Sequence, residues 1–285
     1  MNKIALGTAQ FGLDYGINNL SGKIAENISH QILRYAYDRK IDYIDTAYVY
    51  GDSEQVLGSF IKKNKINFKI ISKFSCCSID NFEKSFIESL HRLNSKQLYG
   101  YLVHDFKFFI KNPLLWTKFL KIKNDLLVSK IGFSLYFEEE LDYLLDSGIE
   151  FDIIQVPYSI FDQRFAKYFR ILKSKGIEIF VRSVFLQGLV FKSFENLEPK
   201  FSKFKCKLKA LNKLAEELNL SISSICLNFA VLNDYIDKVV IGFDNLDHFK
   251  QDLFNLKQIN EIKKIENNLL YFKEDDNNII IPINW

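Results

Sequence analysis

Strand-like segments alternate with helical segments along the whole sequence, and this pattern predicts an α/β fold, a single (β/α)8 TIM barrel with C-terminal helices and a short tail. The prediction rests on the alternation itself, on the absence of a domain-sized linker, and on a length that suits one barrel of roughly 250 residues plus insertions. An open dinucleotide-binding sheet fits less well, because no G-x-G-x-x-G motif follows any strand. Residues 1–285 are therefore expected to form a single domain.

The predicted strands are short apolar runs that end in polar or glycine residues. Apolar residues alternate in the segment that ends at Asp45, and an almost unbroken apolar run at 151–156 is typical of a parallel strand that is buried on both faces. The strands are expected at residues 4–6, 41–45, 68–74, 98–104, 130–135, 151–156, 177–184 and 238–243.

The predicted helices follow these strands and show apolar residues at helical spacing. Asp52 with Gln55 three residues later forms a capping-box pattern, Pro113 suits a first helical turn, and Gly176 suits a turn after a helix. Helices are expected at residues 28–39, 53–63, 80–93, 113–123, 138–145 and 164–174, with further helical segments within 206–233 and 245–272.

Charge and composition argue against nucleic acid and membranes as partners. The formal net charge is +3, with acids and bases mixed along the chain, and no apolar run is long enough to span a bilayer. The sequence enters its first strand without the charged and apolar regions of a signal peptide. We therefore expect a cytoplasmic protein that acts on a small molecule, and the oligomeric state is left open.

The four cysteines do not form a metal-binding pattern. Cys76, Cys77, Cys206 and Cys226 lack the paired spacing of a zinc site, and two adjacent cysteines are a poor basis for a disulfide framework. We expect reduced thiols and no metal site. A redox role for the Cys76–Cys77 pair is the alternative, because the pair follows the strand that carries Lys73.

Four polar residues are placed at the carboxyl ends of consecutive predicted strands or on the loop that follows: Asp45, Tyr50, Lys73 and His104. Alone, each has an ordinary structural explanation; together, they are expected to share the face of a barrel where chemistry takes place. A phenol has a pKa of about 10, so Tyr50 becomes a useful acid only beside a cation such as Lys73, which Asp45 would hold in place.

His104 completes this predicted site, because an imidazole can donate a hydrogen bond to a carbonyl oxygen that gains negative charge. The four residues suit the reduction of a carbonyl or the oxidation of an alcohol. No side chain supplies hydride, so a nicotinamide cofactor is implied.

Sequence motifs containing these residues resemble the aldo-keto reductases, in the order and spacing usual for that family. The similar segments cover nearly the whole chain and lie at residues 6–9, 45–51 with 53–54, 71–73, 102–104, 131–134, 155–159 and 239–242. The resemblance implies an NADP(H) or NAD(H) cofactor extended across the carboxyl-end face. It also implies that Tyr50 is the general acid, that Lys73 and Asp45 tune it, and that His104 orients the carbonyl.

The resemblance further implies a set of cofactor-binding residues. Ser134 and Gln155 would bind the carboxamide, Thr8 would lie by the adjoining ribose, and residues 183–188 would follow the pyrophosphate. Residues 242–245, with three residues of the next helix, would surround the adenosine. The full set is Thr8, Ser134, Gln155, Arg182, Ser183, Gly188, Gly242, Phe243, Asp244, His248, Gln251 and Asp252.

The chain departs from the family pattern at several positions. Leu135 replaces an asparagine that would contact the carboxamide, and Arg182 stands where many members carry a tyrosine stacked on the nicotinamide. A stacked guanidinium there would favour the reduced cofactor, since the oxidised ring is cationic. The N-terminal hairpin that closes the barrel bottom in many members is expected to be shortened or absent.

The choice between the two nicotinamide cofactors is left open. The family implies NADP(H), and Lys250 is near enough in sequence to reach a phosphate. Asp244, in contrast, suits a ribose 2′-hydroxyl and repels a 2′-phosphate, and His248 stands at a position often held by arginine. We favour NADP(H) at this stage.

The expected substrate is a small carbonyl or alcohol in a pocket lined by Phe11, Tyr15, Tyr48, Phe106 and Trp285, with a short loop after His104. Residues 7–16 and 181–188 resemble members associated with bacterial surface-polysaccharide sugars, which suggests a keto-sugar or sugar nucleotide. Two alternatives remain. One is a cofactor-binding sensor or regulatory subunit with little turnover, and the other is a barrel hydrolase or lyase that uses Asp45 and His104 around a metal.

Overall fold

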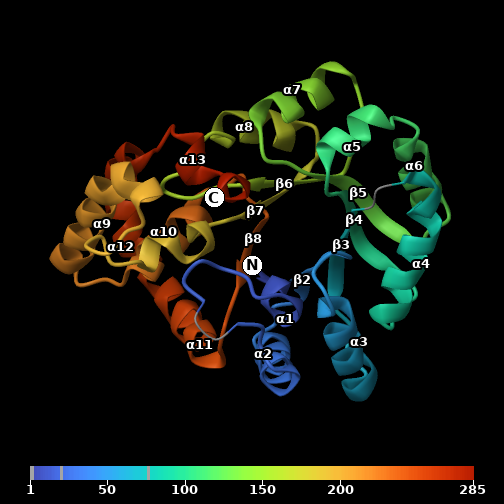
Figure 1. Cartoon of the computed structure of the whole chain (residues 1–285), viewed down its shortest axis with the longest axis horizontal. Helices are drawn as coiled ribbons and strands as arrows, with labels where there is room; N and C mark the ends of the chain where they lie inside the picture. The colour runs from blue at the N-terminus through green and yellow to red at the C-terminus, as the bar shows by residue number, and fades with distance from the viewer. Residues whose placement is uncertain (1–2, 20–21, 76–77) are drawn as a thin grey trace.

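The computed structural model describes residues 3–19, 22–75 and 78–285, and its strands form a closed parallel barrel in sequence order (Figure 1). The strands are β1 (Ile4–Gly7), β2 (Tyr43–Asp45), β3 (Lys69–Phe74), β4 (Leu98–Val103), β5 (Val128–Ser134), β6 (Ile153–Pro157), β7 (Glu178–Arg182) and β8 (Lys238–Gly242). The predicted (β/α)8 barrel is confirmed.

The barrel closes through the pairing of its first and last strands. Ile4 lies opposite Val239 and Gly7 lies opposite Gly242, so β1 pairs with β8 along its whole length. On its other edge β1 pairs with β2 through Leu6 and Gly7. The first and the last strand of the sequence therefore meet in one seam of the sheet.

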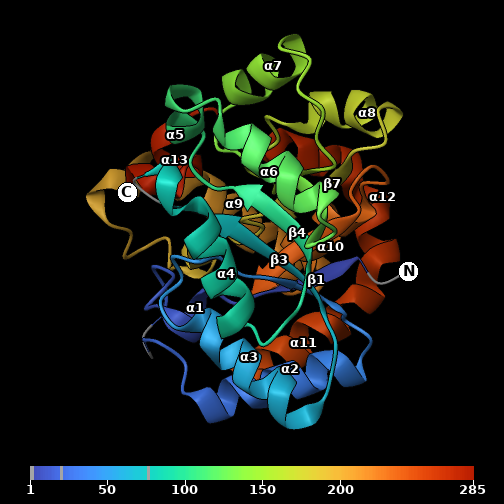
Figure 2. The same ribbon diagram turned by 90° about the vertical axis from the view of Figure 1, so that its right-hand side faces the viewer.

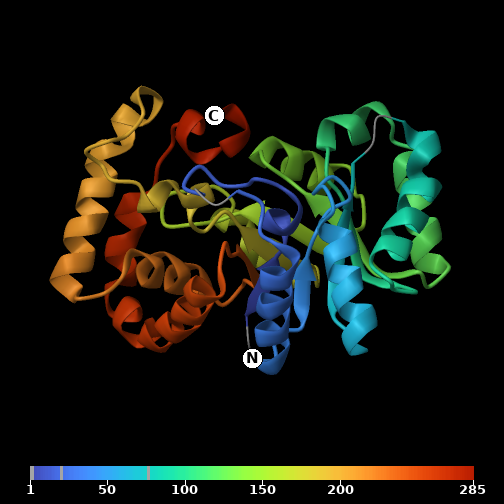
Figure 3. The same cartoon turned by 60° about the horizontal axis from the view of Figure 1, so that its bottom comes forward.

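Helices surround the barrel, and Figure 2 shows α4 and α6 alongside β3 and β4. The helices are α1 (Ala9–Gly12), α2 (Glu26–Asp38), α3 (Ser53–Asn64), α4 (Phe82–Arg92), α5 (Phe106–Lys111), α6 (Leu115–Asn124), α7 (Glu138–Asp146), α8 (Ala166–Ser174), α9 (Lys205–Leu218), α10 (Ile222–Leu232), α11 (Leu246–Asn255), α12 (Ile259–Leu269) and α13 (Asn277–Ile280). Within the described ranges, none of these helices is long and apolar enough to cross a membrane. The C-terminal tail with α13 lies on the opposite side of the barrel from the start of β1 (Figure 3).

Three local predictions differ from the structure. Asp52 does precede α3, but its side chain forms no capping hydrogen bond and instead pairs with Lys23 at 2.5 Å. The loop after β4 is not short, because it holds α5, whose first turn is capped by Asp105. Pro113 lies before α6 rather than in its first turn, since that helix begins at Leu115.

The barrel interior is a packed core rather than a channel. It is filled by the buried side chains of Ala5, Ile71, Leu102, Ile153, Phe180 and Val240. At the amino ends of the strands, the Tyr99 hydroxyl donates to Glu178 at 2.9 Å, and the Lys238 ammonium lies 3.9 Å from the ring centroid of Tyr43. The opposite, carboxyl-end face carries the polar residues that the sequence singled out.

Candidate active site

A buried ion pair lies at the carboxyl ends of β2 and β3. The Lys73 ammonium donates to the two carboxylate oxygens of Asp45 at 2.8 and 2.7 Å and to the Thr46 carbonyl at 2.9 Å. These bonds use all three N–H donors of the ammonium. Burial lowers the pKa of Lys73, and the Asp45 carboxylate acts against that change. The sequence-predicted pair is therefore brought together.

Two further predicted residues continue this buried network. Gln155, on β6, donates its amide N–H to Asp45 Oδ1 at 2.7 Å, and the Ser134 hydroxyl, at the end of β5, donates to the Gln155 carbonyl at 3.3 Å. Both side chains are almost wholly buried. Gln155 and Ser134 were predicted to bind a carboxamide, and the structure connects them to the ion pair.

Tyr50 lies on the loop after β2, with the Lys73 ammonium 5.2 Å from its ring centroid. Burial raises the pKa of the Tyr50 hydroxyl, and the Asp45 charge raises it further, while the charge of Arg182 acts in the opposite direction. Tyr50 therefore carries its proton at neutral pH, and a nearby cation is what would make that proton easier to release.

The Tyr50 loop is fixed by two glycines that touch each other. A Cβ atom on Gly12 would lie 1.8 Å from the Tyr50 carbonyl oxygen, and one on Gly51 would lie 2.3 Å from the Gly12 carbonyl oxygen. Gly51 also has a φ of 56°, a conformation that glycine adopts at little cost. The Ser53 hydroxyl lies 2.7 Å from the Thr8 hydroxyl and holds the start of α3 to β1. No larger residue fits at either glycine without moving Tyr50.

His104 follows β4 and faces Tyr50. The two ring centroids lie 6.0 Å apart at an interplanar angle of 79°. Burial, together with the charges of Lys73 and Arg182, lowers the pKa of His104 from its usual 6.5 to about 3. The imidazole is therefore neutral at physiological pH, so it can donate a hydrogen bond to a carbonyl oxygen without being a source of protons.

A cleft of about 490 Å³ runs from Tyr50 across the carboxyl-end face. Asp45 and Tyr50 line one end of it, and most of the predicted cofactor residues line the rest: Thr8, Arg182, Ser183, Gly188, Gly242, Asp244, His248, Gln251 and Asp252. Three predicted residues lie beneath the lining: Lys73, Ser134 and Gln155. Their hydrogen-bond network connects them to the cleft through Asp45. The side chain of Phe243 is buried and stacks on Phe249 with centroids 4.2 Å apart, so it does not line the cleft.

The loops after β1 and β7 meet across this cleft. The Ile17 amide donates to the Gln187 carbonyl at 3.0 Å, and Gly188 approaches Asn18 so closely that a Cβ atom on Gly188 would lie 2.9 Å from Asn18 Cβ. The sequence predictions missed Gln10, Asn18 and Ser223, which also line the cleft, whereas Gln187 lies within the predicted segment 183–188. No sequence motif marks the missed residues, because they reach the cleft from separate parts of the fold: Gln10 from α1, Asn18 from the loop after β1 and Ser223 from α10.

Carboxylates line the far end of the cleft. Asp244 pairs with His248 at 2.7 Å, and Asn245 caps α11 through the His248 amide at 2.8 Å. Burial raises the pKa of Asp252 to about 6, while a hydrogen bond from Ser223 and the nearby His248 lower it. Lys250, which was expected to be able to reach a phosphate here, pairs with Asp247 at 3.2 Å and is not among the residues that line the cleft.

Most of the predicted aromatic substrate residues have other contacts. Tyr15 lines the cleft beside Tyr50, as expected. Phe11 is wholly buried in the core, and the Tyr48 hydroxyl donates to Glu88 at 2.6 Å. Phe106 packs on Phe133, and Trp285 packs edge-on to Phe201.

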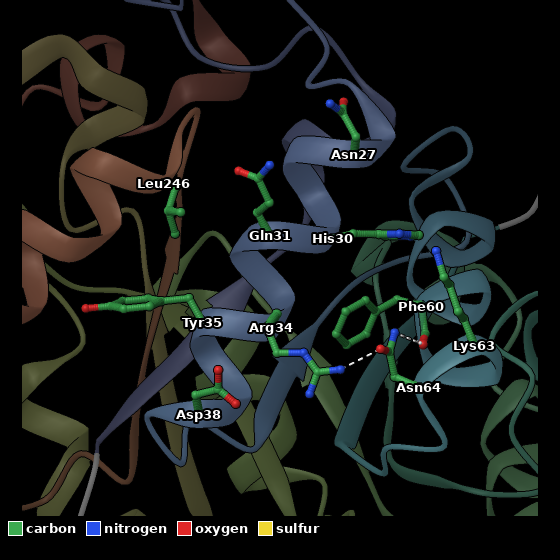
Figure 4. Close-up of a pocket in the computed structure, with 10 residues that line it drawn as sticks. All are labelled: Asn27, His30, Gln31, Arg34, Tyr35, Asp38, Phe60, Lys63, Asn64 and Leu246. Atoms are coloured by element: carbon green, nitrogen blue, oxygen red, sulfur yellow. Dashed lines mark hydrogen bonds between the residues drawn. The ribbon is translucent and has the colours of Figure 1, made fainter.

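A second hollow, of about 440 Å³, lies between α2 and α3 beside Leu246 (Figure 4). Two of its polar side chains are paired: Arg34 donates to the Asn64 side chain at 2.5 Å, and Asn64 donates to the Phe60 carbonyl at 2.8 Å. None of the predicted site residues lines this hollow.

The described cysteines offer no reactive pair. Cys206 is exposed, and Cys226 is buried, which raises the pKa of its thiol. Cys76 and Cys77, on which the redox alternative depended, lie outside the described residues. Among the described histidines, cysteines and carboxylates, no group of three or more is arranged to hold a metal ion.

The barrel and the site together define a class of protein. A tyrosine, a buried lysine–aspartate pair and a neutral histidine stand at the carboxyl ends of consecutive strands, beside a long polar cleft. In a (β/α)8 barrel, this arrangement suits an oxidoreductase that reduces carbonyls.

Comparison with protein families shows to which family within this class the chain belongs. Residues 3–267 match the model of the aldo/keto reductase family, and the chain belongs to that family. A comparison with curated protein sequences found no match.

Solved structures of bacterial aldo-keto reductases share the fold. The holo form of the aldo-keto reductase AKR11C1 from Bacillus halodurans aligns with a TM-score of 0.74 at 18% identity, over 96% of this chain and 94% of the other. The glycerol dehydrogenase AKR11B4 from Gluconobacter oxydans aligns with a TM-score of 0.71 at 19% identity, over 95% and 91%. A putative aldo-keto reductase from Pseudomonas aeruginosa aligns with a TM-score of 0.70 at 19% identity, over 90% of each chain.

Proposed function

We propose that this protein reduces a small aldehyde or ketone to an alcohol with a reduced nicotinamide cofactor, and that Tyr50 is the general acid. The observation that supports this most strongly is the arrangement of Tyr50 between the buried Lys73–Asp45 pair and the neutral His104, at the end of a long cleft. Residues 1–285 would act as a single domain, and a cytoplasmic location stays a prediction.

The described cleft suits an extended nicotinamide cofactor. Gly7 and Gly242 line it on either side of the β1–β8 seam, and a Cβ atom on Gly242 would lie 2.6 Å from the Gln10 side-chain oxygen, so a larger residue there would displace the end of the Gln10 side chain. Carboxylates at the far end can accept hydrogen bonds from ribose hydroxyls. The cofactor, when bound, would supply the hydride that no side chain can provide.

The residues of the chain would then control the proton and the carbonyl oxygen. His104 would donate an N–H to that oxygen, because its lowered pKa keeps the imidazole neutral. Tyr50 would donate its proton to the same oxygen as the alcohol forms. Lys73 would stabilise the phenolate left behind, with Asp45 holding the ammonium in place.

We propose NADH as the preferred cofactor, although the family resemblance alone favoured NADPH. Asp244 and Asp252 both line the far end of the cleft, and no lysine is among the lining residues there. A carboxylate accepts a hydrogen bond from a 2′-hydroxyl and repels a 2′-phosphate. The substrate class of keto-sugars or sugar nucleotides remains a hypothesis that rests on the sequence resemblance.

A carbonyl screen with each cofactor tests the proposal. Oxidation of NADH or NADPH is followed at 340 nm with simple aldehydes, keto-sugars and sugar nucleotides, using the wild type and Tyr50→Phe, which removes only the hydroxyl. We expect turnover in the wild type and a loss of at least about a hundredfold in the variant. Cofactor binding without reduction of any carbonyl would favour a sensor or regulatory subunit instead.

A further inference from the structure

Arg182, at the carboxyl end of β7, is a half-buried cation whose contacts are all neutral. Its guanidinium donates to the Leu135 carbonyl at 2.9 Å and to the Ser183 hydroxyl at 3.2 Å. The guanidinium carbon lies 4.1 Å from the ring centroid of Tyr136. The arginine is therefore held in a fixed place, and its charge is not balanced by these contacts.

Two other buried cations of the chain have carboxylate partners. Lys73 pairs with Asp45, and Arg164, which is also largely buried, pairs with Asp162 at 2.9 Å. Among the described residues, no carboxylate oxygen lies within 4.0 Å of the Arg182 nitrogens. Glu140 is near enough to respond to the charge of Arg182, but one of its carboxylate oxygens is bound to two backbone amides, at 2.8 and 3.1 Å.

The uncompensated charge faces the reactive end of the cleft. Arg182 lines the cleft together with Tyr50 and Tyr15, and its charge acts on the pKa of both phenols and of His104. A guanidinium has five N–H donors, and the bonds to Leu135 and Ser183 use two of the nitrogens that carry them. Donors therefore remain for a further ligand, and the ligand that matches a planar guanidinium is an oxyanion.

We propose that the substrate of this site carries an oxyanion, a carboxylate or a phosphate, which binds Arg182 while the carbonyl faces Tyr50 and His104. This inference rests on the proposed reductase function and specifies its substrate class. In the reaction the carbonyl carbon takes hydride from the reduced nicotinamide, which is oxidised, and the oxygen takes the proton of Tyr50. The oxyanion is unchanged and serves to hold the substrate.

The test compares matched substrates that differ in one anionic group. Butanal is compared with succinic semialdehyde, and glyceraldehyde with glyceraldehyde 3-phosphate, in the wild type, Arg182→Gln, Arg182→Lys and Arg170→Gln. Arg170 is an exposed arginine of α8 and controls for the loss of one positive charge. We expect the wild type to favour at least one of the anionic partners by at least about tenfold in kcat/KM, mainly through KM.

Arg182→Gln is expected to reduce this preference to near unity, Arg182→Lys to keep part of it, and Arg170→Gln to keep all of it. A wild type that shows no preference in either pair, or a preference that survives in Arg182→Gln, overturns the inference. The cofactor diphosphate is the other oxyanion that Arg182 could bind. If Arg182→Gln weakens NADH binding, measured by fluorescence, and leaves the substrate preference intact, the cofactor is the ligand and the inference is wrong.

A binding measurement separates this inference from the proposed function. Malonate and inorganic phosphate are titrated against the wild type and Arg182→Gln, and the midpoint of thermal unfolding is recorded. At least one of these anions is expected to raise the midpoint in the wild type and not in the variant. If that result is obtained while no carbonyl is reduced, the anion site stands and the reductase proposal fails. Equal responses of both proteins to both anions overturn the anion site.

Discussion

We expect the cofactor preference to depend most directly on Asp244. Its carboxylate lines the far end of the cleft and pairs with His248 at 2.7 Å. Replacing it by arginine removes an anion that would repel a 2′-phosphate and introduces a cation that would attract one. The change also removes an acceptor for a ribose 2′-hydroxyl, so the two cofactors should respond in opposite directions.

The size of the effect follows from the partial exposure of this end of the cleft. Two unit charges 4 Å apart interact by about 1 kcal/mol in water and about 4 kcal/mol near a protein surface. The Asp244 side chain is 29% exposed, which places it between these limits. Loss of the repulsion and gain of an attraction of similar size sum to about 3 kcal/mol, so the ratio of the two dissociation constants should change roughly a hundredfold.

Fluorescence titration with NADH and NADPH measures both constants without any substrate. We expect the wild type to bind NADH more tightly and Asp244→Arg to bind NADPH more tightly. The matched control is Asp247→Arg, which makes the same charge change on α11 at a residue that is 90% exposed and outside the cleft lining. Tighter NADPH binding by the wild type, or the same shift in both variants, would refute the assignment of Asp244 as the selector.

Four further predictions concern the ion pair, the loop contact and two titrating groups. Asp45→Ala should lower the free energy of unfolding by about 3–5 kcal/mol, because it leaves the Lys73 charge buried without a partner; adding Lys73→Met should recover much of this loss in urea denaturation. Gly12→Ala should destabilise the fold by about 1–3 kcal/mol, since its Cβ overlaps a backbone carbonyl, and should lower kcat more than it raises KM; unchanged kcat would contradict this. Asp252 has a pKa raised to about 6, so it is anionic above that pH and neutral below it. Because a neutral Asp252 no longer repels a 2′-phosphate, NADPH binding should strengthen relative to NADH binding as the pH falls from 7.5 to 5.5. This change should be smaller in Asp252→Asn. His104 has a pKa lowered to about 3, so the pH profile of kcat/KM should show no titration of its imidazole between pH 5 and 8. An inflection near pH 6.5 that disappears in His104→Asn would argue against the neutral imidazole.

The barrel was predictable because each buried parallel strand leaves its own apolar run in the sequence. The predicted and observed strands agree to within a few residues, and the predicted ion pair of Asp45 and Lys73 forms because adjacent parallel strands bring their carboxyl ends together. Short elements were missed for a physical reason. Helices such as α1 and α5 are too short to show a helical period, so the sequence around them looks like loop.

The contacts within the site were less predictable, because they depend on which of several possible partners a side chain meets. An aromatic residue looks the same in a sequence whether it lines a cleft, like Tyr15, or fills the core, like Phe11. Asp52 has the residue type of a helix cap but finds Lys23 instead. The lack of a carboxylate partner for Arg182 depends on its surroundings in the folded chain, so no local sequence pattern predicts it.

The pairing of β1 with β8 has a consequence for how ligands affect the folded chain. Gly7 and Gly242 are register partners in that seam, and both line the cleft. A ligand that spans them contacts the first and the last strand at once, and binding to the native state alone adds stability that grows with ligand concentration. Hydrogen exchange at the seam amides, such as the Val239 amide bonded to Lys3, should therefore slow when the cofactor binds, more than it does on the opposite side of the barrel.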